Sequence, residues 1–477
     1  MKRIICILLT AVLILGLCAC GESGKSASKK GFQVGFNRQS ITPTTNGVPI
    51  AGGDSSARPS EGFLDEVATT CIAFSKDGET YLIYTCDFMI LNASVTDPVK
   101  ATIEAATGVP ASNILFNCTH THSGVDINSS KWDGVSAYRQ LFSTRALKAA
   151  EKALEDLSPA TISYGSTQTE GMTFVRHYLM NDGTFSGNGH GSSASGYKDH
   201  MYEADGELQI IKFTRAAEDK KDIIIASFPA HATTVNSTNR TSLSACYPGA
   251  FRAAVERDAG VHCAFFQGAS GDQVPNSKIE EKNAINPKNH KNHGEKLAEY
   301  ALSVELTPME DSKLVFKSWE YTGPSMKEGL DDAELMAHAS EIASLSNKLG
   351  SSHIDVQALV SKYGFLTVYE ATGLVSRSKA PETRTMRLVA MQLGSEVSMA
   401  FAPYEMFGMH GKYIKDNSPF AMDFIVTCTE DYQGYFPHVE GCEEGFYEYD
   451  VTKYERGTGE KLAELFASTL TEMKNAG

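Results

Sequence analysis

The stretch FNCTHTHSGV, residues 116–125, places two histidines one residue apart behind an apolar segment. The apolar residues 114–118 predict a β-strand that runs into polar residues. If the chain stays extended to His122, the side chains of Cys118, His120 and His122 share one face. Neutral imidazole is a common zinc ligand, so this face predicts either a metal site or hydrogen-bonded histidines at a strand end.

Three further segments end in side chains that can bind a metal. His231 follows the apolar strand of FPAHATTVNSTNR (228–240), where Pro229 predicts the strand's end because proline cannot donate to the ladder. Glu405 lies in AFAPYEMFGMHG (400–411) at a predicted strand-to-helix junction, and Tyr435 follows the strand FIVTC (424–428). A catalytic zinc site usually has three or more protein ligands and an open position for water.

Two of these side chains also fit structural roles that need no metal. An acidic side chain such as Glu405 at a helix start is favoured by the helix dipole. Tyr435 fits a core aromatic, because a phenol with a reference pKa of about 10 loses its proton only beside a strong cation.

Helical and strand patterns alternate along the rest of the chain. Helices are predicted at 96–108, 136–157, 247–260 and 457–475, a hairpin at 207–215 and 222–231, a buried strand from 261, and a strand pair at 383–393 and 395–407. This order predicts an α/β fold of mixed β-sheets with flanking helices and an active site at strand ends. The glycine- and serine-rich segment 181–200 predicts either a flap over that site or a disordered surface insertion.

The N-terminus has the pattern of an export signal. Residues 1–19 combine a basic start with an apolar run from Ile4 to Leu17, which is shorter than the roughly 20 residues of a membrane span. Leu17 to Cys20 resembles a bacterial lipobox, so we expect a lipidated Cys20, a flexible tether to residue 31 and a folded body at 32–477. The expected location is the bacterial cell surface, anchored to the membrane by lipid; an ordinary cleaved signal peptide is the alternative.

Composition excludes some classes of protein. The chain carries a net charge of −15, which argues against a nucleic-acid partner because such binding needs cationic surfaces. The cysteines after Cys20 show no C-x-x-C spacing, so a zinc ribbon or a disulfide scaffold is poorly supported. We expect buried thiols inside apolar strands instead.

Several segments together resemble the neutral/alkaline, non-lysosomal ceramidases, which are zinc-dependent amidases that split ceramide into sphingosine and a fatty acid. The segments that carry this resemblance are VGFNRQSITPTTNGVPIAGG (34–53), NCTHTHSG, FPAHATTVNSTNR, QGASGDQVPN, APYEMF and DYQGYFP. The resemblance implies that residues 32–477 form a ceramidase-like catalytic domain. It also implies a zinc-dependent amidohydrolase acting on ceramide or a related N-acyl compound.

The resemblance further implies which residues form the site. The implied zinc ligands are His120, His231, Glu405 and Tyr435. The implied catalytic residues are His122, beside the scissile amide, with Arg176 and Tyr447 lining the site. In the implied reaction zinc-activated water attacks the amide, His122 transfers protons, and Arg176 and Tyr447 stabilise the oxyanion.

Four features depart from the family pattern. Val274, in GDQVPN, stands where the family has a serine proposed as a nucleophile, so a serine-based mechanism cannot operate there. Cys246 replaces a usual acidic residue, and Tyr404 a usual glycine. The 30 residues after Tyr447 leave no room for the family's C-terminal β-sandwich. The lost serine and Tyr404, together with the expected lipid anchor, favour as the alternative a non-catalytic surface lipoprotein that binds a lipid or glycoconjugate with a degraded site.

Overall fold

The computed structural model describes residues 31–52, 59–129, 132–187, 196–235, 239–276, 291–439 and 446–476. The predicted signal peptide, Cys20 and all of the tether before Gly31 therefore lie outside the described residues, as does the middle of the glycine-rich segment, 188–195. The flanks of that segment belong to a small sheet of β8 (Tyr178–Met180), β9 (Phe185–Ser186) and β10 (Tyr197–His200). No described helix is both long and apolar enough to cross a membrane.

The largest sheet has nine strands in the order β14-β12-β11-β6-β1-β3-β4-β5, with β16 beside β6. One half consists of β1 (Gln33–Ser40), β3 (Ala68–Lys76), β4 (Glu79–Cys86) and β5 (Ile114–Cys118). The other half consists of β6 (Ser158–Gln168), β11 (Glu207–Arg215), β12 (Ile223–Phe228), β14 (His262–Gln267) and β16 (Thr307–Pro308). Only two register pairs, Gln33 with Pro159 and Val34 with Ser158, join the halves at β1 and β6.

A shared hydrophobic core fills the space between the two halves. Phe74 of β3 packs 5.5 Å from Phe213 of β11, ring centre to ring centre. A second sheet, β17 (Leu314–Pro324), β18 (Thr383–Leu393), β19 (Val397–Phe401) and β21 (Met422–Val426), packs on the same core. β4 and β5, β12 and β14, and β19 and β21 pair in parallel, while most other pairs are antiparallel. The predicted α/β fold with mixed sheets is therefore confirmed.

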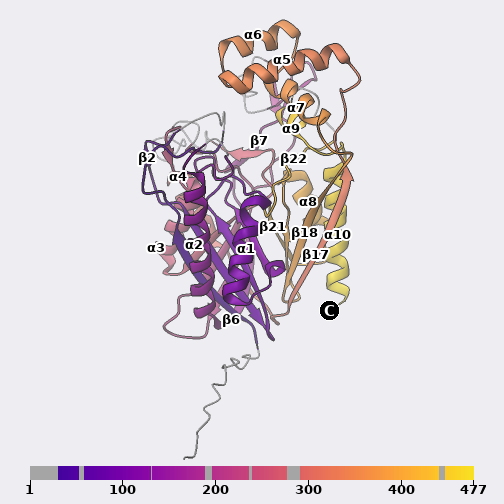
Figure 1. Cartoon of the computed structure of the whole chain (residues 1–477). Coiled ribbons are helices and arrows are strands. Elements are labelled where there is room, and N and C mark those ends of the chain that lie inside the picture. The colour runs from indigo at the N-terminus through magenta and orange to yellow at the C-terminus, as the bar shows by residue number, and fades with distance from the viewer. Residues whose placement is uncertain are drawn as a thin grey trace, which may run out of the picture.

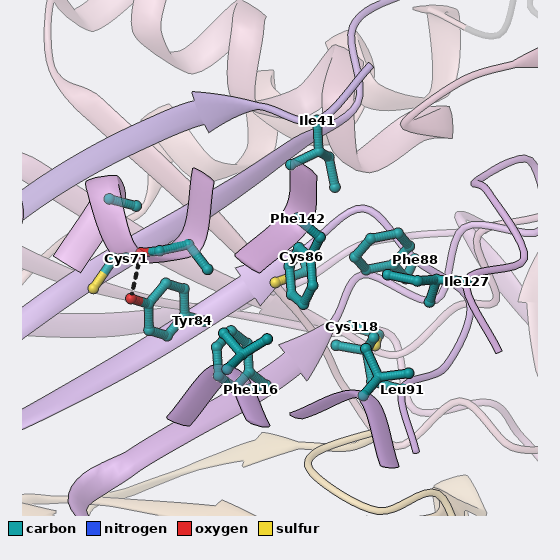
Figure 2. Close-up of a cluster of buried hydrophobic side chains, with 14 of the residues drawn as sticks. Ile41, Cys71, Tyr84, Cys86, Phe88, Leu91, Phe116, Cys118, Ile127 and Phe142 are labelled. Atoms are coloured by element: carbon teal, nitrogen blue, oxygen red, sulfur yellow. Dashed lines mark hydrogen bonds between the residues drawn. The ribbon is translucent and has the colours of Figure 1, made fainter. Parts of the chain in front are cut away.

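Helices cover the outer faces of the sheets. α1 (Ala93–Thr107) and α2 (Val135–Glu155) lie side by side over the first half (Figure 1). Further helices of the described body are α3 (Cys246–Ala259), α4 (Lys291–Ser303), α8 (Gly408–Asn417) and α10 (Thr458–Asn475). Figure 2 shows Tyr84, Phe88, Phe116 and Phe142 gathered in one buried cluster, to which α2 contributes Phe142. Tyr84 stacks on Phe116 at 4.3 Å, and Phe88 meets Phe142 edge-on at 5.1 Å. The predicted helices and the predicted strand pairs β11–β12 and β18–β19 are confirmed.

A group of three helices lies between β17 and β18 in sequence and was not predicted. It consists of α5 (Ala333–Leu349), α6 (Ile354–Tyr363) and α7 (Val368–Ser378) and projects from one end of the body (Figure 1). α7 packs closely on the short helix α9 (Tyr447–Val451). The contact is so close that a Cβ added at Gly373 of α7 would lie only 2.1 Å from the carbonyl oxygen of Asp450 in α9. The group is therefore attached to the segment that carries Tyr447.

Candidate metal centre

The histidine pair is not on an extended strand, so that expectation was wrong. β5 ends at Cys118, and its parallel partner β4 ends directly opposite, at Cys86. His120 then adopts φ 59, in the left-handed region that residues other than glycine rarely occupy. This turn nevertheless brings the two imidazoles together, with the Nε2 atoms of His120 and His122 3.2 Å apart.

His231 reaches the same place from the end of β12. The strand stops at Phe228, immediately before Pro229, as predicted. The backbone N–H of His231 donates to the carbonyl of Gln273 at 2.9 Å. Its fully buried ring lies 4.8 Å from that of His120.

Glu405 and Tyr435 meet in a short parallel pair of strands. They are direct register partners in β20 (Glu405–Met406) and β22 (Tyr435–Phe436). Glu405 Oε2 lies 3.1 Å from His120 Nε2 and 3.0 Å from His231 Nε2. Tyr435 Oη lies 3.3 Å from His231 Nε2. The four predicted ligands therefore converge from four separate segments of the chain.

The hydrogen bonds of the two imidazoles determine which nitrogens can bind a metal. His120 Nδ1 lies 2.8 Å from the carbonyl oxygen of Met89, and His231 Nδ1 lies 2.6 Å from that of Ser270. A carbonyl only accepts, so both Nδ1 atoms carry the proton and both Nε2 atoms present a lone pair. These lone pairs face Glu405 Oε2, for which the described residues supply no ordinary hydrogen-bond donor.

This arrangement of acceptors fits a divalent cation. Buried lone pairs without a proton between them repel, and a buried polar atom without a partner is costly. Two ligand atoms of a tetrahedral zinc ion with bonds of about 2.0–2.1 Å lie about 3.3 Å apart. The observed separations of 3.0–3.3 Å are close to that value. Two imidazoles, a carboxylate and a phenol thus form a donor set that fits zinc.

The pKa values describe the same cluster without a metal. Burial alone would raise the pKa of Glu405, but His120 and His231 hold it well below its usual value. Burial would lower the pKa of His120, but Cys428 and Glu405 raise it well above the usual value. Without a metal, a second proton on His120 Nε2 is favoured by the neighbouring Glu405 Oε2, and a metal ion bound at Nε2 would displace it.

His122 lies on the more open side of the cluster and is partly exposed. Its backbone N–H donates to Ala232 at 3.1 Å. Burial, followed by the neighbouring His120 and His231, holds its pKa well below the usual value, so the ring is neutral. Gly52, at φ +83, packs against it so closely that a Cβ there would lie 2.7 Å from the His122 Cβ.

Arg176 and Tyr447 both approach Tyr435. Arg176 Nε donates to Glu448 Oε1 at 2.6 Å, and its Nη2 lies 3.1 Å from the Gly271 carbonyl and 3.5 Å from Tyr435 Oη. The ring of Tyr447, which is partly exposed, meets that of Tyr435 edge-on at 5.6 Å. All seven predicted site residues therefore lie in one region, and Arg176 is held by protein groups behind Tyr435.

Three residues of this region were missed. Tyr432 Oη donates to Glu405 Oε1 at 2.5 Å. Glu448, fully buried, lies between Arg176 and His177, whose Nε2 is 3.0 Å from Glu448 Oε2. Each of the three is close in sequence to a predicted residue: Tyr432 to Tyr435, His177 to Arg176, and Glu448 to Tyr447. Closeness in sequence alone does not reveal which side chains are in contact.

The residues that depart from the family pattern occupy structural positions. Val274 lies in β15 (Gln273–Pro275), paired with Phe174 of β7 (Thr173–Val175). Cys246 begins α3 at φ 58, with its thiol 2.9 Å from the hydroxyl of Thr234. Tyr404 is buried in a hydrophobic cluster beside Glu405. None of them removes a side chain from the metal cluster.

Comparison with known proteins places the fold. No family model matches the chain, and no curated protein does. The solved structure of neutral ceramidase from Pseudomonas aeruginosa matches with a TM-score of 0.67 and 17% identity, covering 94% of this chain and 75% of that one. A ceramidase complexed with C2 matches with a TM-score of 0.67 and 16% identity, covering 94% and 76%. The protein therefore has the fold of the neutral ceramidases.

Proposed function

We propose that the protein is a zinc-dependent amidohydrolase that cleaves the amide bond of ceramide or a related N-acyl compound. The observation that carries the proposal is that Glu405 Oε2 lies 3.1 Å from His120 Nε2 and 3.0 Å from His231 Nε2, with Tyr435 Oη 3.3 Å from His231 Nε2. The ceramidase fold supports the choice of substrate class.

The metal would be held by His120, His231, Glu405 and Tyr435. When bound, zinc lowers the pKa of water toward about 7 and polarises a carbonyl group. Arg176 supports the phenol of Tyr435 in this set, because a guanidinium 3.5 Å from its oxygen favours the deprotonated form. Burial and the charge of Glu405 otherwise raise the pKa of Tyr435 well above its usual value.

The remaining residues act on the substrate. His122 is neutral and partly exposed, so its ring can accept a proton from the attacking water and return it to the leaving amine. Tyr447, partly exposed beside Tyr435, can donate a hydrogen bond from its hydroxyl to the oxyanion that forms on the carbonyl. By distance alone His122 also fits the ligand set, since its Nε2 lies 3.2 Å from that of His120. Its open side favours the proton-transfer role.

We also propose that the protein is anchored at the bacterial cell surface through a lipidated Cys20. β1 runs parallel to β4 and β5 within the sheet, so the chain enters the body at the end opposite to His120. A short tether would then hold the site away from the anchoring membrane. Labelling with radioactive palmitate tests the anchor: wild type should be labelled and Cys20→Ala should not.

Metal analysis and hydrolysis of fluorescent N-acyl substrates on one preparation test the function. We expect about one zinc per chain, activity that is lost with a chelator and restored by zinc, and loss of both zinc and activity in His231→Ala. His353→Ala, an N-cap of α6 far from the cluster, is the control and should keep both. A folded, zinc-loaded wild type that binds but does not cleave N-acyl lipids would favour the alternative, a binding lipoprotein.

A further inference from the structure

Tyr432 and the metal cluster divide the two oxygens of Glu405 between them. The Tyr432 hydroxyl donates to Oε1 at 2.5 Å. The other oxygen, Oε2, faces His120 Nε2 and His231 Nε2 at 3.1 and 3.0 Å. A carboxylate that accepts a strong hydrogen bond on one oxygen is fixed in its rotation and presents only the other oxygen to the cluster.

Tyr432 is itself held in place by its backbone. Its N–H donates to the Leu91 carbonyl at 3.2 Å, and its own carbonyl accepts from Lys453 Nζ at 3.2 Å. The same ammonium lies 5.3 Å from the centre of the Tyr432 ring, within cation–π distance. The phenol is therefore presented to Glu405 from an anchored position, between β21 and β22 in sequence.

We propose that Tyr432 is a positioning residue that keeps Glu405 a one-oxygen ligand and so strengthens zinc binding; this rests on the metal centre of the proposed function. For Glu405 to bind a metal through both oxygens, Oε1 would have to give up the Tyr432 hydrogen bond. Two-oxygen carboxylate binding suits larger ions with more ligands, such as calcium, whereas a catalytic zinc site keeps few protein ligands and an open position. Tyr432 thereby preserves the open position that the reaction needs.

The test is the zinc affinity of Tyr432→Phe, measured by competition with a coloured chelator. Loss of a hydrogen-bond partner behind a metal ligand typically weakens metal binding about 10–100-fold. We expect that loss here, together with a kcat that recovers at saturating zinc and a KM that does not change. A kcat that stays low with zinc bound would overturn the positioning role.

Tyr363→Phe is the matched control. Tyr363 donates to Glu341 Oε2 at the same 2.5 Å, but this pair lies on the surface of the α5–α7 group. The chemical change is identical, so its zinc affinity should equal that of wild type. Melting temperatures of the metal-free variants show whether either substitution disturbs the fold.

A second measurement does not depend on the variant folding. Zinc-edge X-ray absorption of the wild type should show a single oxygen contributed by Glu405. A two-oxygen carboxylate, or a Tyr432→Phe affinity within twofold of wild type, would overturn the inference and leave the proposed function intact. A wild type that binds no zinc would instead refute the proposed function.

Discussion

Glu448 offers a quantitative test of how the residues behind Tyr435 are held. Its carboxylate is fully buried between Arg176 and His177. Burial alone would raise the pKa of Glu448, but these two partners lower it from 4.5 to about 2. That difference corresponds to about 3 kcal/mol of folding free energy. Removing one charge of a buried pair costs a similar amount, about 3–5 kcal/mol.

The substitution Glu448→Gln keeps the shape of the side chain and removes its charge. For a folded body of roughly 445 residues, about 3 kcal/mol corresponds to a melting temperature lower by about 3 °C at pH 7. The lowered pKa means that the unfolded chain binds the proton more readily than the folded protein. The wild type should therefore lose this stability as the pH falls from about 4.5 toward 2. The variant should lack that part of the acid sensitivity.

Differential scanning calorimetry from pH 7 to pH 3 measures both effects. Glu464→Gln, an exposed carboxylate on α10, is the control and should melt within about 1 °C of wild type. A Glu448→Gln protein that also melts within about 1 °C at pH 7 would refute the assignment of Glu448 as the counter-ion of Arg176.

Three further predictions concern other positions. Gly52→Ala would place a Cβ 2.7 Å from the Cβ of His122 and displace that ring, so we expect kcat to fall at least about tenfold with zinc content unchanged. An unchanged kcat, or lost zinc, would contradict the proton-transfer role of His122. Burial raises the pKa of Asp423 to about 6, so the contribution of Asp423 to folding stability should rise as the pH falls from about 6 toward 4. Asp423→Asn should reduce this rise in a plot of melting temperature against pH. A plot with the same slope as that of wild type would contradict the raised pKa of Asp423. Val274→Ser should leave amide hydrolysis within about twofold of wild type because no serine nucleophile is needed, whereas a tenfold gain would point to serine chemistry.

Strand ends made the metal ligands candidates, but the resemblance to the neutral ceramidases was what joined them into one ligand set. Pro229 marked the end of β12, and Glu405 and Tyr435 followed apolar strands whose ends meet in β20 and β22. The left-handed turn at His120 was not predictable, because alternation of side chains describes only an extended chain. The turn at His120, rather than strand alternation, brings the imidazoles of His120 and His122 together.

The supporting residues were not predictable in the same way. Tyr432 and Glu448 act through Glu405 and Arg176, and these contacts join segments far apart in the chain. The α5–α7 group did carry a local signal. Thr367 and Glu370 have the residue types and spacing of a capping box. The hydroxyl of the N-cap Thr367 accepts from the backbone N–H of Glu370, and Glu370 Oε2 accepts from the backbone N–H of Leu366, one residue before the cap.

In the proposed function, four distant segments of the chain hold one metal ion. A crystal structure of the zinc-loaded protein, with anomalous data collected on both sides of the zinc edge, tests it directly. We expect one anomalous peak bounded by His120 Nε2, His231 Nε2, Glu405 Oε2 and Tyr435 Oη. A folded, zinc-saturated protein with no peak among these four atoms would show that the four segments do not share a metal ion.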